Sequence, residues 1–238
     1  GTDEWLEENA IKYNLKYYID KNKIPLGIGG GMNFCADKVE SEFIMFLHSD
    51  FYVTKDWDLQ ALKIMDKYPN KKLWVSSHRV EPQMFMNSTT RPGTVIVPKE
   101  SFGAYYNDFD TKLFDEWSQE FVTNNEFEIP KGEGVSGLIR KKDWDKIGGN
   151  DSLFAPASWE DMDLFLRMLK NGYEFILTSK SLVWHFGARG SHRLEENNGL
   201  TSIRQRKAEE KNAAKWLSKW GSYPSFDEYG MIKGLQND

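Results

Sequence analysis

Polar side chains that can bind metal follow two apolar runs of strand length. His48, Ser49 and Asp50 end the run of residues 43–47, and His185 ends a later run. In open α/β sheets, ligands bind beyond the carboxyl ends of the strands, where a carboxylate can hold the cation of a diphosphate. If Asp50 and His185 converge, their mixed oxygen and nitrogen donors suit Mn²⁺ or a similar cation. The alternative is structural: Asp50 can cap the next turn, and His185 can be a packed, hydrogen-bonded histidine.

A second group of acids stands in the first turn of a predicted helix over residues 159–170. Its members are Glu160, Asp161 and Asp163. Acids at a helix N-terminus complement the helix dipole, and Ser158 and Asp161 have the spacing of a capping box, which gives the group a structural explanation. The dipole also keeps a carboxylate ionised, and an ionised carboxylate at the mouth of a cleft can act as a general base. The two roles are compatible.

Glycines punctuate two further segments. Residues 186–199 are polar and carry Arg189 and Arg193, so this loop can close over a pyrophosphate or remain a solvated surface loop. The glycine-rich turn predicted at residues 27–31 lacks the Lys-Ser/Thr of a phosphate-binding P-loop. Met32 also occupies the position of the last glycine in a dinucleotide-binding pattern, so neither nucleotide motif is predicted there.

The elements that must position these groups alternate along the chain. Helical periodicity and helix-stop signals alternate with short apolar runs typical of strands. This alternation predicts an α/β fold with a sheet of mixed direction. The predicted helices cover residues 1–14, 32–39, 56–68, 111–121, 141–147, 159–170 and 202–220. The predicted strands cover residues 15–19, 43–47, 73–80, 94–97, 173–177 and 181–185, and residues 134–140 form a strand or a turn.

The composition limits the classes of function. The chain of 238 residues fits one domain, and its net charge of -5, without blocks of like charge, argues against nucleic-acid or anionic-membrane binding. Its single cysteine, Cys35, suits a reducing compartment, so a cytoplasmic location is expected. No apolar run reaches the roughly 20 residues of a transmembrane segment, and no signal peptide opens the chain. The nine Trp, ten Tyr and fifteen Phe fill a core or, in part, line a sugar site.

The order of the motifs resembles that of the family 2 glycosyltransferases, inverting enzymes with the GT-A fold. His48-Ser49-Asp50 falls where that family has its metal-binding Asp-x-Asp, and His185 matches the histidine often found after its last core strand. The resemblance extends over residues 1–190. Four more stretches carry it: residues 1–6, which follow the family's Asp-Asp-Gly-Ser turn; Gly29 to Asn33 with Ala36, which resemble its glycine-rich helix start; and residues 148–151 and 159–163, which are similar to its Gly-Gly-x-Asp…Glu-Asp-x-Asp signature.

The resemblance implies a GT-A-like α/β fold, with a mixed, mostly parallel sheet flanked by helices in a single domain over residues 1–190. Residues 191–238 are then a mobile loop and a C-terminal helical extension. The family's first strand, first helix and second strand have no counterpart in this sequence. His48 also replaces the first aspartate of the metal motif, and because imidazole suits Mg²⁺ less well, Mn²⁺ is the expected cation.

The resemblance also implies an activity. The expected enzyme moves a sugar from a UDP- or GDP-sugar to the hydroxyl of a glycan or other acceptor, with inversion and a divalent metal. Asp161 falls on the proposed base of the family signature, and Glu160 is assigned to the same catalytic group. The alternative is a non-catalytic sugar- or nucleotide-binding module of the same fold. The expected metal ligands are Asp50, His185 and His48, and the expected substrate contacts are Gly30, Asn33, Trp159, Asp163, Arg189 and Arg193.

Overall fold

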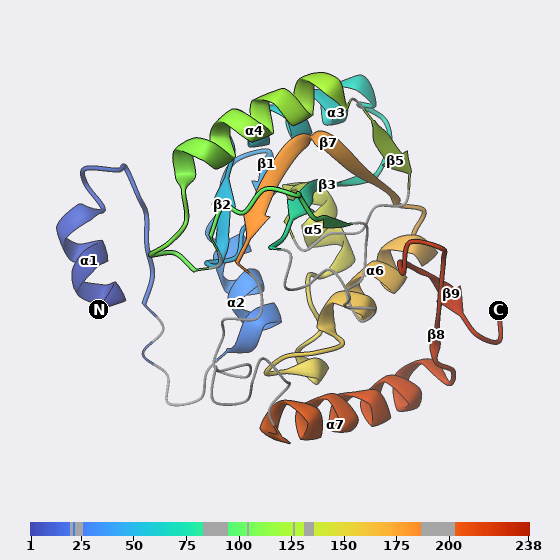
Figure 1. Ribbon diagram of the computed structural model, residues 1–238. Coiled ribbons are helices and arrows are strands. Elements are labelled where there is room, and N and C mark those ends of the chain that lie inside the picture. Colours follow the sequence, from blue (N-terminus) through green and yellow to red (C-terminus); the bar gives the residue numbers. More distant parts are fainter. Residues whose placement is uncertain are drawn as a thin grey trace.

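A computed structural model describes residues 1–19, 21, 26–82, 95–103, 105–125, 127–130, 136–186 and 203–238. A mixed sheet lies at the centre of the described part, with helices on both faces (Figure 1). Hydrogen-bonded neighbours run in the order β1-β6-β3-β7-β2, while β4 pairs with β3 and β5 pairs with β7. The strands are β1 (Phe43–Met45), β2 (Phe51–Val53), β3 (Leu73–Val80), β4 (Val95–Ile96), β5 (Glu128–Pro130), β6 (Gly137–Arg140) and β7 (Glu174–His185).

Strand β3 lies inside the sheet and is buried along its whole length. Successive side chains of a strand point to opposite faces, so β3 contributes to two apolar clusters. Trp74 packs with α5 (Lys141–Ile147) and α6 (Glu160–Lys170), and Val75 packs with α3 (Trp57–Lys67) on the other face. A third cluster joins the end of β3 to α4 (Thr111–Asn124). Gly137 of β6 leaves room for the indole, because an added Cβ would lie 2.1 Å from Trp74.

The strand directions differ in part from the expectation. The mixed sheet is confirmed, but the expected parallel majority is wrong within the described residues. β3 runs parallel to β4 and β7, whereas the pairings of β1 and β3 with β6, and of β2 and β5 with β7, are antiparallel. Apolar patterning reports how deeply a strand is buried, not its direction, and short strands such as β1 and β2 carry no directional signal.

Several predicted elements are confirmed near their expected bounds, among them β3, α3, α4, α5 and α6. Strand β7 unites two predicted strands, because its ladder with β3 is only interrupted by an irregularity opposite Ser77 and His78. The predicted strand at residues 15–19 is absent. The glycine run is not a turn but the first half of α2 (Gly27–Ala36). Its glycines allow close packing: an added Cβ at Gly29 would lie 2.9 Å from Cβ of Asn150.

The C-terminal part begins with α7 (Ile203–Trp220), which confirms the helix predicted over residues 202–220. A hairpin of β8 (Pro224–Phe226) and β9 (Ile232–Leu235) follows, and it was not predicted. Figure 1 shows α7 running beneath α6. Trp216 and Ile232 join the same apolar cluster as Leu164 of α6, so the described part of residues 191–238 shares the main core. The boundary at residue 190 stays a prediction.

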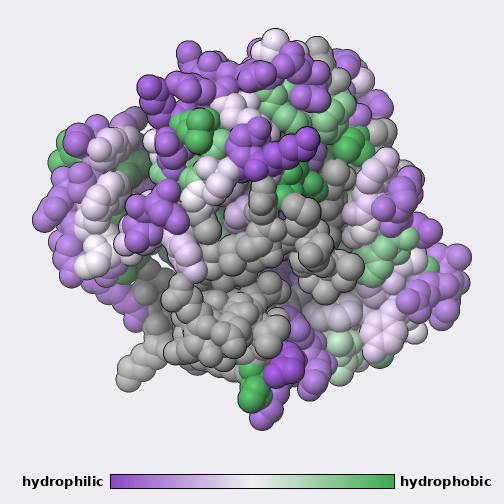
Figure 2. Space-filling model, in the orientation of Figure 1, coloured by the Kyte–Doolittle hydropathy of each residue, from purple (hydrophilic) through white to green (hydrophobic). Residues whose placement is uncertain are grey.

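Helix α1 (Thr2–Asn9) lies at the periphery and buries none of its residues (Figure 1). Figure 2 shows the same side of the molecule with mainly hydrophilic side chains along its upper and outer edges. Among the described residues no helix combines the length and the apolar character needed to cross a membrane.

Candidate active site

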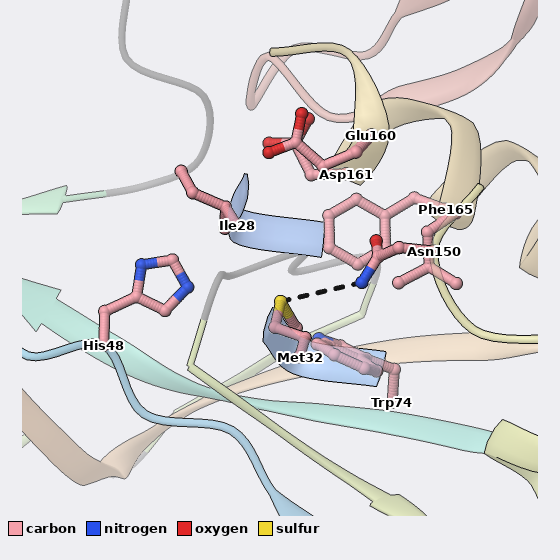
Figure 3. Close-up of a pocket in the computed structure, with 9 residues that line it drawn as sticks. Ile28, Met32, His48, Trp74, Asn150, Glu160, Asp161 and Phe165 are labelled. Carbon is pink, nitrogen blue, oxygen red and sulfur yellow. Dashed lines mark hydrogen bonds between the residues drawn. The ribbon is translucent and has the colours of Figure 1, made fainter. Parts of the chain in front are cut away.

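A pocket of about 150 Å³ lies between α2 and the first turn of α6. Figure 3 shows the carboxylates of Glu160 and Asp161 side by side at one end and the His48 ring across from them. The remaining walls are mostly apolar, so charged groups here are poorly hydrated. The lining residues are Ile28, Met32, His48, Trp74, Asn150, Glu160, Asp161, Leu164 and Phe165.

His185, at the end of β7, lies between two carboxylates. Its Nε2 is 3.3 Å from Oδ2 of Asp50, and its Nδ1 is 2.7 Å from Oε1 of Glu81. Asp50 reaches this position because it precedes β2, whose Phe51 pairs with His185. Glu81 directly follows β3, which runs parallel to β7, so both strands deliver their side chains to the same edge. Asp50 and His185 therefore converge, as the sequence analysis required for a metal site.

The pKa values of the ionisable groups in this cluster shift in directions that follow from burial and from the neighbouring charges. Burial disfavours protonated His185, but the hydrogen bonds and charges of Asp50 and Glu81 outweigh it and raise the pKa of His185. Burial opposes ionisation of Asp50, but the hydrogen bond and charge of His185 lower the pKa of Asp50 below its ordinary value. Burial lowers the pKa of His48, which the charge of Asp50 offsets only in part. At neutral pH, Asp50 is therefore ionised and His48 is neutral, the forms that bind a cation, whereas His185 must give up its Nε2 proton when that nitrogen binds one.

The donor chemistry of Asp50 and His185 fits a transition-metal cation. An ionised carboxylate oxygen faces an imidazole nitrogen, and the other ring nitrogen of His185 is held by buried Glu81, as is usual for metal-bound histidines. No group of three His, Cys, Asp or Glu side chains in the described part of the chain is arranged to hold a metal by itself. Further ligands would have to come from a bound diphosphate and from water.

A strained turn presents the acidic pair. Ser158 and Trp159 both have a φ of 76°, a left-handed conformation that costs a non-glycine residue on the order of 1–3 kcal/mol. Trp159 is the N-cap residue of α6 and no side chain caps the helix, so the predicted capping box is wrong. Asp161 instead accepts a hydrogen bond from the N–H of Met162 (2.8 Å). The surrounding structure must enforce this turn, since its own sequence does not favour it.

The two acids of the pocket titrate differently. Burial raises the pKa of Glu160 to about 8, and the charge of neighbouring Asp161 adds to the rise. Burial also raises the pKa of Asp161, but the hydrogen bond from Met162 and the charges of His48 and Arg79 oppose this rise. At neutral pH Glu160 is therefore mostly protonated and can donate a hydrogen bond. Asp161, beside it, is the candidate proton acceptor, since a backbone hydrogen bond and the charges of His48 and Arg79 favour its ionised form.

Asn33 fastens α2 to the segment before α6. Its Nδ2 donates to the carbonyl of Asn150 (2.8 Å), and its Oδ1 accepts from the N–H of Asn150 (2.8 Å). Both ends of the Asn33 amide are therefore used within the protein. Oδ1 of Asn150 and Oε2 of Glu160 are buried and have no hydrogen-bond partner among the described residues. Because buried polar atoms are normally satisfied, these two oxygens are available to the polar groups of a ligand.

Three further residues that were predicted to bind the substrate lie near the pocket but do not line it. Gly30 lies on α2, where an added Cβ would lie 3.2 Å from Cβ of Leu26. The Trp159 ring packs on Trp216, with ring centroids 5.4 Å apart. Asp163 is fully buried and points toward α7; it accepts hydrogen bonds from Arg167, Lys219 and Trp220. Arg189 and Arg193 lie outside the described residues.

Two polar residues of the site, Glu81 and Asn150, were not among the predicted site residues. Glu81 directly follows the strand of residues 73–80, but residues 76–79 of that strand are polar, so Glu81 does not stand out against an apolar run as Asp50 does. Asn150 falls within a motif that was noticed, but nothing in the sequence indicates that its amide faces the pocket.

The fold is that of the GT-A glycosyltransferases. The structure is similar to that of GalNAc-T7 with UDP, GalNAc and Mn²⁺, with a TM-score of 0.53 and 13% identity, over 77% of this chain and 35% of that chain. It also matches S. aureus TarS in complex with UDP-GlcNAc, with a TM-score of 0.47 and 15% identity, over 91% of this chain and 60% of that chain. The chain thus spans 35% and 60% of these two structures.

The model of glycosyl transferase family 2 matches residues 1–119, and this chain belongs to that family. A comparison with curated proteins finds no match.

Proposed function

We propose that this protein transfers a sugar from a nucleoside diphosphate sugar to an acceptor hydroxyl, with inversion at the anomeric carbon. One observation carries the proposal: Glu160 and Asp161 share a pocket with His48, and the ring of Phe51 packs between His48 (centroids 5.9 Å apart) and His185 (4.7 Å). A proton acceptor and a candidate cation site are therefore neighbours. Membership of glycosyl transferase family 2 supports the type of reaction, and a similar structure, GalNAc-T7, is complexed with UDP and Mn²⁺.

Asp161 acts as the general base in this proposal. The acceptor oxygen attacks the anomeric carbon while its proton passes to the Asp161 carboxylate. The bond from that carbon to the diphosphate oxygen breaks, and its electron pair leaves with the diphosphate. General-base assistance is worth about 10²–10⁴-fold in rate. Glu160, protonated at neutral pH, donates a hydrogen bond to a sugar oxygen and so orients the reacting group.

The other residues of the site bind and orient. Asp50 and His185, with His48 beside them, would hold the divalent cation, with Mn²⁺ favoured over Mg²⁺ because two of the donors are imidazoles. When bound, such a cation offsets the negative charge that develops on the leaving diphosphate. The apolar faces of Trp74 and Phe165 in the pocket wall offer a surface for a pyranose ring.

The remaining predicted contacts have supporting roles in this proposal. Asn33 and Asp163 keep the walls of the pocket in place through their bonds to Asn150 and to α7. Gly30 and Trp159 lie just behind the lining. Arg189 and Arg193 supply positive charge to the diphosphate, as expected from the sequence.

An assay of donor hydrolysis and transfer tests the proposal. Purified wild-type protein, the Asp161→Asn variant and the Asp50→Ala variant are incubated with Mn²⁺ and a set of UDP- and GDP-sugars. We expect turnover by the wild type with at least one donor, almost none by Asp161→Asn, and weaker donor binding by Asp50→Ala. Calorimetry that shows nucleotide-sugar binding by the wild type without any turnover would instead support the alternative, a non-catalytic binding module.

A further inference from the structure

One face of α7 contacts the segment that leads into the acidic pair. Residues 212, 215, 216 and 219 recur at intervals of three and four, so their side chains lie on the same side of the helix. Each of them reaches the segment of residues 151–163. The contacts are Asn212 with three backbone carbonyls, Lys215 with the carbonyl of Leu153 (2.6 Å), Trp216 with the ring of Trp159, and Lys219 with the carboxylates of Asp151 (2.7 Å) and Asp163 (2.5 Å).

Asn212 makes the most concentrated of these contacts. Its Nδ2 lies 2.7 Å from the carbonyl oxygen of Phe154, 2.9 Å from that of Ala157 and 2.9 Å from that of Ser158. The side chain is 1% exposed, so water does not substitute for it. The three carbonyls belong to the turn that ends in the left-handed residues Ser158 and Trp159. One buried amide therefore binds three backbone carbonyls of this turn.

The opposite side of the turn rests on α2. The carbonyl of Pro156 accepts a hydrogen bond from the N–H of Ile28 (2.9 Å). Gly27 lies so close that an added Cβ would be 2.0 Å from the same oxygen. Ile28 lines the pocket across from the acids (Figure 3). The turn is thus held between two helices, and its position sets the distance between two walls of the pocket.

We propose that Asn212 is a positioning residue of the active site. It touches no substrate; through the turn of residues 154–159 it fixes where Glu160 and Asp161 enter the pocket. Without its N–H groups, the carbonyls of Phe154, Ala157 and Ser158 lose these hydrogen bonds, the left-handed turn at Ser158 and Trp159 is held less firmly, and the first turn of α6 shifts. The catalytic consequence of this proposal rests on the proposed function, whereas the structural consequence does not. The helix α7 is then part of the active-site scaffold.

The experiment uses the Asn212→Leu variant, which keeps the side-chain volume but removes the donors. Ser218→Ala, on the exposed side of the same helix, is the matched control. Hydrogen exchange followed by mass spectrometry should show faster exchange over residues 154–163 in the leucine variant and no change in the control. Steady-state kinetics, normalised to the folded fraction, should show a loss of kcat on the order of 10- to 100-fold with donor KM within about 2-fold of the wild type. If the leucine variant does not fold, Asn212→Ser, which keeps one hydroxyl donor, should show the same pattern more weakly.

The outcomes separate the two claims. Unchanged exchange over residues 154–163 overturns the positioning role. Faster exchange with an unchanged kcat overturns its importance for catalysis. A wild-type protein that neither hydrolyses nor transfers any nucleotide sugar contradicts the proposed function instead, and hydrogen exchange alone then decides whether Asn212 fixes the turn.

Discussion

Burial and the charge of Asp161 leave a proton on Glu160 at neutral pH. The amide of a Glu160→Gln variant has nearly the same shape as that protonated acid and still donates a hydrogen bond. We therefore expect this variant to lose less than about 10-fold in kcat. Asp161→Asn removes the proton acceptor and should lose about 10²–10⁴-fold. Transfer kinetics at pH 7, with melting temperatures as the folding control, compare the two, and an equal loss in both would contradict this division of roles.

The same proton makes stability depend on pH. Glu160 ionises near 4.5 in the unfolded chain and at about 8 in the folded protein, so the folded state binds the proton more tightly. The resulting stabilisation is present below pH 4.5 and is lost as the pH rises to about 8. The free energy of unfolding should therefore fall less between pH 5 and pH 8 in Glu160→Gln than in the wild type. Urea titrations at the two pH values measure this, and parallel decreases would show that Glu160 titrates normally.

Glu81 is not itself a candidate metal ligand, but it is hydrogen-bonded to one, His185. Its carboxylate holds Nδ1 of His185 and so directs Nε2 toward Asp50. Replacing such a partner of a metal-bound histidine typically costs 10–100-fold in metal affinity. We expect a loss of about this size in Mn²⁺ affinity, measured by calorimetry with UDP present, for Glu81→Gln. The control is Glu128→Gln, which removes only a surface ion pair with Lys67. Unchanged Mn²⁺ affinity in Glu81→Gln would argue against His185 as a ligand.

At the scale of elements, a comparison of two neighbouring glycines measures how much the contact between α2 and the segment before α6 contributes to stability. Gly148 and Gly149 both have positive φ, but an added Cβ meets nothing within 4 Å at Gly148 and lies 2.4 Å from Oδ1 of Asn33 at Gly149. Both alanine variants should lose about 1–2 kcal/mol from backbone strain. Only Gly149→Ala should lose at least about 1 kcal/mol more, because it also breaks the hydrogen bonds between Asn33 and Asn150. Chemical denaturation measures the difference, and equal losses would mean that the contact adds no stability.

Long, strongly patterned elements were predictable, whereas several short ones were not. The apolar periodicity of α3 and α6 reflects the face that each helix buries, so it is visible in the sequence. The hairpin of β8 and β9 has only a few residues in each strand, too short for a period to show. The glycine run was misjudged because glycine lowers helix propensity, whereas in α2 its missing side chain permits close packing on Asn150.

The candidate site was predictable to the extent that it lies at element ends. His185 ends a strand, Glu160 and Asp161 begin a helix, and Asp50 follows an apolar run and directly precedes β2. At such element ends, polar groups are visible against an apolar run. Asn212 lies in the middle of a polar helix, and its role depends on three carbonyls far away in the sequence. No local sequence pattern indicates such a contact, which is recognisable only in the folded structure.

At the scale of the whole molecule, α7 and the C-terminal hairpin pack into the same core as α6, the helix that begins with Glu160 and Asp161. Trp216 is fully buried in the cluster that includes Leu164 of α6, and Lys219 and Trp220 satisfy the buried carboxylate of Asp163. Removing one partner of a buried charge costs several kcal/mol, as does removing a large buried aromatic side chain. These losses together are comparable to the whole stability of a typical domain.

We therefore expect a chain that ends at residue 202 to lose cooperative folding, with a broad thermal transition by circular dichroism and rapid proteolysis within α6. The control is removal of residues 1–9, since α1 buries no side chain. That truncation should leave the melting temperature within a few degrees of the wild type. If the chain ending at residue 202 melts as sharply and at the same temperature as the full chain, then α7 and the hairpin are a separable extension, and the acidic turn must be held by α2 alone.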